Sequence, residues 1–301
     1  MTQELSVLIL TFNEEMHIER CIKSLQSFAK DIFIVDSYST DKTVEIAKAL
    51  NAKVYQNKWV NYAVQYQWGL DNCPIQTEWV MRMDADEYVL PELAEEIIDK
   101  IDAINENISG VYIKRRVHFM SRWIRHGSYY PIWLLRIWRY NQGRIEERWM
   151  DEHIKLSFGE TIQFENDLID DNKNNLTWWT QKHNNYATRE AVDILNIIYG
   201  FKKYDEVEPK LLGTQEQRKR WFKLRYAKLP LFFRPFIYFH IRYFFQFGFL
   251  DGNPGLIWHF LQGFWYRFLV DAKINEIYFR AKKNDKEAIL ELLEKEYGIV
   301  F

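Results

Sequence analysis

The sequence is poor in the residues that mark several common protein classes. Its 301 residues include only two cysteines, Cys21 and Cys73, which are too far apart in the chain for a metal-binding spacing. Two widely separated cysteines favour a reducing compartment, with a single disulfide between them as the alternative. The formal net charge is only −2, so the chain as a whole has no excess of positive charge for binding nucleic acid.

Glycine is missing where nucleotide-binding loops often need it. The first apolar run, Leu5–Leu10, continues into Thr11–Glu15 without a glycine. The Gly-x-Gly-x-x-Gly fingerprint of dinucleotide-binding proteins is therefore absent from this position. The chain also starts with this strand-like run rather than with the basic segment and apolar core of a signal peptide, which predicts a cytoplasmic location.

Strand and helix patterns alternate along the first hundred residues. Short apolar runs predict strands at Leu5–Leu10, Ile32–Val35, Ala52–Tyr55 and Trp79–Met83. Helical spacing of apolar residues predicts helices at Glu15–Phe28, 39–50, Tyr62–Leu70 and Leu93–Ile104. This alternation predicts an α/β protein with a Rossmann-like, mostly parallel central sheet.

The regular alternation of strand and helix patterns ends after residue 110. We expect two more strands, Val111–Phe119 and Trp133–Tyr140, and a helix over Ala187–Tyr204. A break in composition falls near Asp205–Gly213, after which the chain is aromatic and basic. We therefore predict an α/β domain over residues 1–205 and a C-terminal helical region over residues 206–301.

Acidic side chains follow three of the predicted strands. Glu14 and Glu15 follow the first, Asp36 the second, and Asp84 with Asp86 the fourth. In an open α/β sheet, ligands bind outside the carboxyl ends of the strands, where these acids converge. Side chains two residues apart on a strand project the same way, so Asp84 and Asp86 can face one cation. Mg²⁺ and Mn²⁺ suit carboxylates and usually share them with substrate phosphates, which predicts a site for a metal-bound nucleotide diphosphate.

Three ordered motifs resemble those of a known family. They are Thr-Phe-Asn-Glu-Glu (11–15), Val-Asp-Ser-Tyr-Ser-Thr-Asp-Lys-Thr (35–43) and Met-Asp-Ala-Asp-Glu (83–87). Together they resemble the family 2 glycosyltransferases with the GT-A fold, and more closely the bacterial enzymes that build lipopolysaccharide core or capsule. The resemblance implies an inverting transfer of a sugar from a nucleotide-sugar, in most of the family a UDP-sugar, to a lipid-linked or surface-glycan acceptor.

The resemblance also implies roles for individual residues. Asp86 and Asp84 would hold Mn²⁺ or Mg²⁺, with Asp86 as the direct ligand and Asp84 near the ribose or a metal-bound water. The other residues implied to bind the nucleotide-sugar are Thr11, Phe12, Asn13, Glu14, Glu15, Asp36, Ser37, Gln65, Arg82, Ala85 and Arg136. A metal held there would offset the negative charge that develops on the departing diphosphate.

An inverting transfer needs a base that takes the proton of the acceptor hydroxyl. The family places an acid for this step late in the catalytic domain, where this chain has Asp151 and Glu152. The commoner family patterns have His or Glu directly before that acid, and this sequence departs from them. Its register against the Val-His-Glu form favours Glu152, with Asp151 kept beside it.

Some of these residues have plain structural interpretations. Asp36 lies in a segment rich in helix-capping residue types, and Glu14 and Glu15 also suit the first turn of a helix. Arg136 equally suits a solvated strand face. For the whole chain, the alternatives are a catalytically inactive, membrane-associated scaffold with this fold and a sugar-phosphate nucleotidyltransferase.

The C-terminal region combines aromatic residues with positive charge. Between Pro209 and Phe247 there are nine Lys or Arg residues and one acid, Glu216. The Phe-rich run Leu231–Leu250 has the length of a membrane span, but two arginines and a proline interrupt it. Each central Arg costs about 2.5–3.5 kcal/mol on insertion. We therefore expect helices that lie on the inner surface of the membrane, with packing on the catalytic domain or in a homo-oligomer as the alternative.

Overall fold

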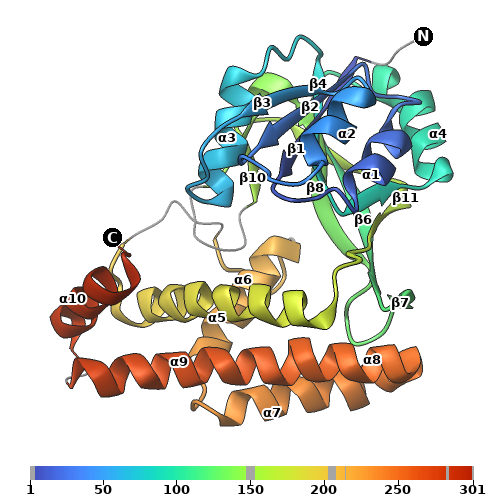
Figure 1. Cartoon of the computed structure of the whole chain (residues 1–301). Helices are drawn as coiled ribbons and strands as arrows, with labels where there is room; N and C mark the ends of the chain where they lie inside the picture. The colour runs from blue at the N-terminus through green and yellow to red at the C-terminus, as the bar shows by residue number, and fades with distance from the viewer. Residues whose placement is uncertain (1–3, 147–152, 203–207, 214, 283–284, 300–301) are drawn as a thin grey trace. The chain divides into compact units, whose positions relative to one another are not determined.

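The computed structural model describes residues 4–146, 153–202, 208–213, 215–282 and 285–299. Their contacts form two compact units (Figure 1). The α/β unit contains the described residues up to 173, and the helical unit contains those from 174 onward. The sequence predicted this boundary at 205/206, after the helix over residues 176–199. That helix packs with the C-terminal helices and so belongs to the helical unit. The predicted α/β fold with a helical C-terminal region is confirmed.

The first half of the central sheet is parallel. Strands β1 (Leu5–Thr11), β2 (Asp31–Asp36), β3 (Lys53–Gln56) and β4 (Trp79–Asp84) lie in the order β3-β2-β1-β4. Strands β1, β2 and β4 are short, largely apolar runs, as buried parallel strands usually are, whereas β3 is a partly polar strand at the edge of the sheet. The carboxyl ends of these four strands therefore meet at one edge of the sheet.

The second half of the sheet is mixed. It continues through β8 (Ile132–Arg139), β6 (Ile108–Phe119), β11 (Glu160–Asp170) and β5 (Glu87–Val89), with β7 (Arg122–Ile124) paired to β6. Strand β8 is antiparallel to both β4 and β6, whereas β11 is parallel to β6 and antiparallel to β5. A separate pair joins β9 (Gly143–Ile145) to β10 (Ile154–Leu156).

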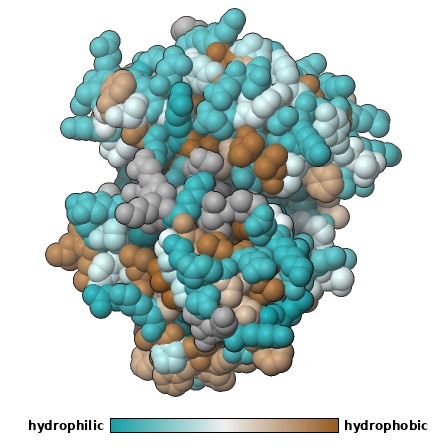
Figure 2. Space-filling model, turned by 90° about the vertical axis from the view of Figure 1, so that its left-hand side faces the viewer, coloured by the Kyte–Doolittle hydropathy of each residue, from teal (hydrophilic) through white to brown (hydrophobic). Residues whose placement is uncertain are grey.

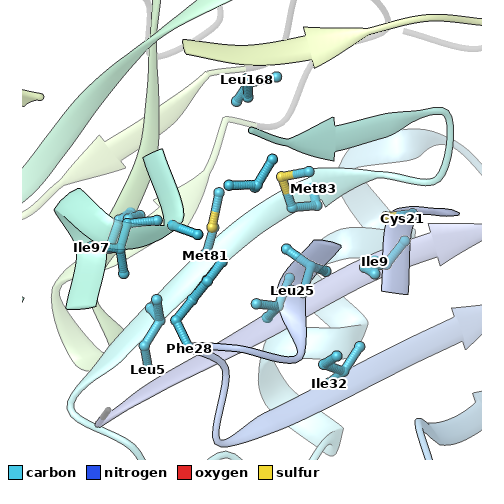
Figure 3. Packing of buried hydrophobic residues seen from close by; sticks show 14 of the residues in the cluster. Leu5, Ile9, Cys21, Leu25, Phe28, Ile32, Met81, Met83, Ile97 and Leu168 are labelled. Carbon is cyan, nitrogen blue, oxygen red and sulfur yellow. The ribbon is translucent and has the colours of Figure 1, made fainter. Parts of the chain in front are cut away.

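Helices cover both faces of the parallel half. One face packs against α1 (Ile18–Leu25), α2 (Thr43–Ala49) and α4 (Pro91–Lys100), and Figure 3 shows Leu25 and Ile97 of this cluster beside strand residues such as Met81. The other face packs against α3 (Tyr62–Asn72). Gly69 of α3 lies so close to the sheet that an added Cβ would meet the Val35 side chain at 2.9 Å. The apolar alternation of β1, with Val7 on one face and Leu8 on the other, follows from this layering.

Strand β11 and helix α5 (Leu176–Tyr199) differ most from the sequence-based prediction, which also lacked the short strands β5, β7, β9 and β10. Strand β11 was not predicted, because its sequence is rich in acids and two irregularities in its pairing with β6 break the apolar alternation. Helix α5 begins well before the predicted Ala187, at an N-cap where the Asn175 side chain accepts a hydrogen bond from the Trp178 N–H (3.0 Å). The polar stretch after Trp179 hides this start in the sequence.

The helical unit is built around α5 and α9 (Tyr266–Ala281), which share a core of aliphatic residues. The remaining helices are α6 (Gln215–Ala227), α7 (Phe233–His240), α8 (Gly252–Trp258) and α10 (Lys286–Tyr297). A π-helical segment, His259–Trp265, joins α8 to α9 as one long helix (Figure 1). Among the described residues, no helix is both long enough and apolar enough to cross a membrane.

Candidate active site

The end of β2 is joined to its neighbours through Asp36. Its carboxylate, which has no exposed surface, accepts hydrogen bonds from the Thr11 hydroxyl (3.0 Å) and the Gln56 side-chain amide (3.1 Å). It also accepts from the backbone N–H and hydroxyl of Ser39 (2.9 and 2.5 Å). An ionised carboxylate offers about four acceptor positions, so these four donors saturate it. In this conformation Asp36 therefore holds the ends of β1, β2 and β3 together.

The loop that follows β1 is fastened to the loop that follows β2. Three consecutive backbone N–H groups donate to side chains of the second loop: Asn13 to Ser39 (2.8 Å), Glu14 to Thr43 (2.7 Å) and Glu15 to Asp41 (3.1 Å). The Glu14 carboxylate pairs with the buried His17 ring at 2.6 Å. Phe12 remains exposed on this well-held edge, where its ring is available to stack on a planar ligand.

Asp84 lies at the end of β4 between a hydroxyl and a guanidinium. The Tyr62 hydroxyl donates to its Oδ1 at 2.7 Å, and Nη2 of Arg136 lies 3.5 Å from its Oδ2. Burial opposes ionisation, but the charges of Arg136 and Arg82 and the Tyr62 hydrogen bond together hold the pKa of Asp84 well below its usual range. Asp84 is therefore an ionised carboxylate with part of its surface still exposed.

Arg136 connects Asp84 to a second, fully enclosed acid. It pairs with Glu87 at 2.5 Å, and Glu87 in turn accepts the Asp84 N–H at 3.0 Å. Burial raises the pKa of Glu87 and the Asp84 charge adds to the shift, while Arg136 opposes it. Arg136 is almost fully buried, so the solvated-strand interpretation of this residue is wrong. Glu87 was not predicted as a site residue, although it directly follows the Asp-x-Asp pattern.

Asp86 is held by the chain that follows β11. The Asn172 side-chain amide donates to its Oδ2 at 2.9 Å, and Arg20 and the Asp171 N–H donate to its backbone carbonyl at 3.1 and 3.2 Å. Arg20 also pairs with the Asp171 carboxylate at 2.8 Å. Sequence reasoning missed all three partners: Asp171 and Asn172 follow the unpredicted strand β11, and Arg20 reaches Asp86 from α1, far away in the sequence.

The other predicted binding residues lie in the same part of the α/β unit. Gln65, on α3, is buried and donates to the Ser37 hydroxyl at 3.1 Å. The Arg82 guanidinium lies over the Tyr62 ring, 4.4 Å from its centroid. Ala85 is buried between the two aspartates in sequence. Gln65 and Ser37 thus fix the loops, whereas Arg82 contributes positive charge beside Asp84.

Strand register brings the three acidic clusters to one edge. Strand β1 lies between β2 and β4, with Thr11 beside Asp36 and Leu10 beside Asp84. Neighbouring strands are about 4.8 Å apart, so the backbones at Asp36 and Asp84 are separated by about 10 Å. The convergence expected from the sequence is therefore present in the folded chain.

The acids of this edge fit a metal that is shared with a ligand. In the part of the chain that the structure describes, no group of three or more His, Cys, Asp or Glu side chains is arranged to hold a metal alone. Mg²⁺ commonly uses only one or two carboxylates and completes its shell with phosphates and water. Asp84 and Asp86 would supply that number, and the Asn172 amide, which donates to Asp86, would then act as an outer partner of a metal ligand.

The predicted bases, Asp151 and Glu152, lie outside the described residues. The segment that contains them connects β9 to β10. On either side of it, the Glu146 N–H donates a hydrogen bond to the His153 carbonyl (2.8 Å).

Comparison with known proteins gives a consistent picture. The family described as Glycosyl transferase family 2 matches residues 6–161. An uncharacterized glycosyltransferase of Rickettsia typhi is 27% identical over 93% of this chain and 89% of its own length. One from Rickettsia bellii is 41% identical, but the match covers only 32% of each chain. The lipopolysaccharide core biosynthesis glycosyltransferase LpsC of Rhizobium meliloti is 33% identical over 39% of this chain and 44% of its own length.

Among solved structures, glucosyl-3-phosphoglycerate synthase from Mycobacterium tuberculosis, in complex with Mn²⁺, uridine diphosphate and glucosyl-3-phosphoglycerate, aligns with a TM-score of 0.32 and 22% identity. That alignment covers 38% of this chain and 44% of the synthase. The family match spans more than half of this sequence and includes the carboxyl ends of β1, β2 and β4, where Asp36, Asp84 and Asp86 lie. The chain belongs to glycosyltransferase family 2.

Proposed function

We propose that this protein is a metal-dependent, inverting glycosyltransferase that moves a sugar from a nucleotide-sugar to a glycan or lipid-linked acceptor. The observation that carries this proposal is the convergence of Asp36, Asp84 and Asp86 at one sheet edge of a family 2 chain. UDP-sugars are the proposed donors, because the resembling family mostly uses them. The name of the relative LpsC supports a cell-envelope polysaccharide as the product.

The donor would lie along the ends of β1, β2 and β4. Phe12 offers an exposed ring for the base, and the loops that Asp36 holds together form the rigid support beneath it. Since the Asp36 carboxylate is saturated, a direct bond from it to the nucleotide would replace one of its present donors. Arg82 would contact the diphosphate beside Asp84, because its positive charge already acts on the Asp84 carboxylate.

Asp86 and Asp84 would hold Mn²⁺ or Mg²⁺ together with the diphosphate. Bound there, the metal would neutralise charge on the leaving diphosphate. Tyr62 and Arg136 keep Asp84 ionised and oriented, and Asn172 orients Asp86 through its side-chain amide. These partners hold the carboxylates in place before the donor binds, which is the preorganisation that electrostatic catalysis requires.

The acceptor hydroxyl would lose its proton to Glu152 or Asp151 as it attacks the sugar carbon from the face opposite the diphosphate. The new glycosidic bond forms as the bond to the diphosphate oxygen breaks, so the configuration at that carbon inverts. We place the enzyme in the cytoplasm at the inner face of the cell membrane, where a lipid-linked acceptor would be accessible.

The test is a thermal-shift titration with UDP in the presence and absence of Mn²⁺. We expect UDP to raise the melting temperature only when Mn²⁺ is present, and Asp86→Ala to abolish that shift. Asp71→Ala, which removes an exposed acid on α3, is the matched control and should keep it. A screen of UDP-glucose, UDP-galactose, UDP-N-acetyl sugars and GDP-mannose for hydrolysis then identifies the donor.

Three outcomes would contradict the proposal. A shift that persists in EDTA or in Asp86→Ala would remove the metal from the mechanism. Absence of a shift with any nucleotide would favour an inactive scaffold. Release of pyrophosphate from a nucleoside triphosphate and a sugar phosphate would identify a nucleotidyltransferase instead.

A further inference from the structure

One side of the helical unit exposes an unusual number of large apolar side chains. We call this set the aromatic face. It comprises Phe233, Phe236, Ile241, Phe244, Phe245, Phe247, Phe249, Leu250, Leu256, Phe260 and Phe268, all of them exposed. Figure 2 shows hydrophobic residues gathered at the lower end of the view, the end at which Figure 1 places α7. Contiguous exposed apolar surface of this kind marks an interaction site rather than ordinary protein surface.

Several rings of the aromatic face are joined to one another through Phe264 and Tyr243. Phe236 on α7 contacts Phe264 on the neighbouring π segment, with ring centroids 4.7 Å apart, and Phe264 contacts Phe260 and Phe268 at 5.6 and 5.8 Å. Tyr243 continues the surface to Phe249 at 6.3 Å. The face is therefore built from two helical segments that pack on each other, and not from scattered exposed residues.

The aromatic face carries almost no charge. Residues 231–270 contain only four charged side chains, Arg234, Arg242, Asp251 and Arg267, and all four are buried or half-buried. Arg234 is fully buried in an ion pair with Asp271 at 2.5 Å, and Arg267 is paired with Glu190. Arg242 donates to the Tyr238 hydroxyl.

This pairing changes the expectation drawn from composition. The positive balance between Pro209 and Phe247 suggested attraction to anionic lipid headgroups. In the folded chain, Lys223 is paired with Asp193 at 2.8 Å and Arg234 with Asp271. Acidic residues on α5 and α9, which lie outside residues 209–247, thus neutralise some of the positive charges in that segment.

We propose that the aromatic face inserts into the headgroup and upper acyl region of a lipid bilayer, and that burial of apolar side chains supplies most of the binding free energy. Helices that lie in the membrane interface bury an apolar face to a shallow depth, and the absence of a membrane-spanning helix among the described residues fits this mode. The inference deepens the proposed function, since a lipid-linked acceptor would lie at that surface. Binding to vesicles needs neither donor nor metal, so the two proposals can fail separately.

The charges beside the face favour a bilayer over a second copy of the chain. Arg234 donates to the Tyr226 and Ala227 carbonyls, so the start of α7 is held at the end of α6, where Arg225 and Lys228 are exposed. Beside inserted aromatic rings, these cations would lie at the level of lipid phosphates. A symmetric dimer through the same face would instead bring both copies of these cations to one interface.

The experiment measures binding of the full chain to vesicles in EDTA. Phosphatidylcholine vesicles, with and without phosphatidylglycerol, are compared at about 0.1 M and about 1 M NaCl, where screening lengths are roughly 10 and 3 Å. We expect binding to phosphatidylcholine alone, with less than about a twofold change at high salt. Phe233→Gln/Phe245→Gln should lower the partition coefficient at least about tenfold, because each ring loses its apolar burial.

Matched controls separate insertion of the aromatic face from charge attraction and from a general loss of surface phenylalanines. Phe158→Gln/Phe279→Gln removes two exposed phenylalanines outside the aromatic face and should bind like the wild type. On phosphatidylcholine vesicles, Arg225→Gln/Lys228→Gln should weaken binding less than about threefold, since the attraction of about 1 kcal/mol per cation applies to anionic lipid surfaces. Circular dichroism checks folding, and the single variant Phe245→Gln, at the most exposed position of the face, should give an intermediate loss.

Two kinds of result would overturn the inference. Binding that requires phosphatidylglycerol and is released at about 1 M NaCl would show electrostatic adsorption instead. A wild-type dimer in lipid-free sedimentation that becomes monomeric in Phe233→Gln/Phe245→Gln, without vesicle binding by either protein, would assign the face to a second copy.

Discussion

The two units of this protein place charged side chains in opposite ways. In the α/β unit, Asp84 shares Arg136 with Glu87 but keeps part of its own surface exposed at the sheet edge. In the helical unit, Arg234 and Asp271 are both completely enclosed, and Asp271 also accepts the Phe232 N–H at 2.8 Å. The first arrangement leaves acceptor capacity for a ligand, and the second leaves none. Of these two buried ion pairs, only the one in which a carboxylate remains exposed to solvent can take part in binding a ligand.

The largest expected effect tests the catalytic side of this comparison. Glu152→Gln should lower the turnover rate by about 10²–10⁴, the usual contribution of a general base, because the acceptor hydroxyl keeps its proton. The Mn²⁺-dependent UDP thermal shift should be unchanged, since the donor site is intact. Asp151→Asn is the paired variant. Wild-type transfer rates in both variants would place the base elsewhere in the chain.

The next effect concerns the enclosed pair of the helical unit. Arg234→Met should lower the free energy of unfolding by about 3–5 kcal/mol, because it leaves Asp271 buried without its partner. The double variant Arg234→Met/Asp271→Leu should recover most of that loss in urea unfolding. The exposed Arg225→Met should change stability by less than about 0.5 kcal/mol. A double variant as unstable as the single one would contradict a purely structural ion pair.

His183, a titratable side chain of the helical unit, is held neutral by burial, whereas Asp84 is held ionised. Burial lowers the pKa of His183 to about 4, although its ring Nδ1 bonds the Trp179 carbonyl at 2.8 Å. The folded state thus favours the neutral His183 ring. The resulting contribution to the free energy of unfolding is complete above the unfolded pKa of about 6.5 and is lost as pH falls through about 4. Between pH 7 and pH 5, wild-type stability should fall by up to about 2 kcal/mol more than that of His183→Gln, measured by urea unfolding. Parallel curves for the two proteins would contradict the burial of a neutral imidazole.

The smallest expected effect concerns the orientation of Asp84. Tyr62→Phe removes the hydroxyl that donates to Asp84 and should lower kcat/KM about tenfold, equivalent to about 1.4 kcal/mol. Tyr66→Phe is the matched control one helical turn away, because the buried Tyr66 hydroxyl has no hydrogen-bond partner among the described residues. Equal losses in the two variants would show that Tyr62 acts through packing alone.

The elements that carry local signals were predictable. The four parallel strands lie within one or two residues of the runs that predicted them, and for β1, β2 and β4 the reason is that strands buried on both faces need continuous apolar sequence. Strand β11 gave no such signal, because acids and pairing irregularities interrupt it. The partners that it brings to Asp86 were therefore missed with it, whereas the acids at the ends of β1, β2 and β4 were found.

The sequence by itself determined the four parallel strands and the helices between them, the acidic strand ends and the family. These features depend on residues close together in the chain, where apolar spacing and motif order are directly readable. Only the tertiary structure decided which charges remain available: Arg136 became a buried bridge, Asp36 a saturated acceptor, and Arg234 the partner of Asp271. The physical reason is that a charge is neutralised by neighbours in space, and in this fold those neighbours come from strands and helices far away in sequence.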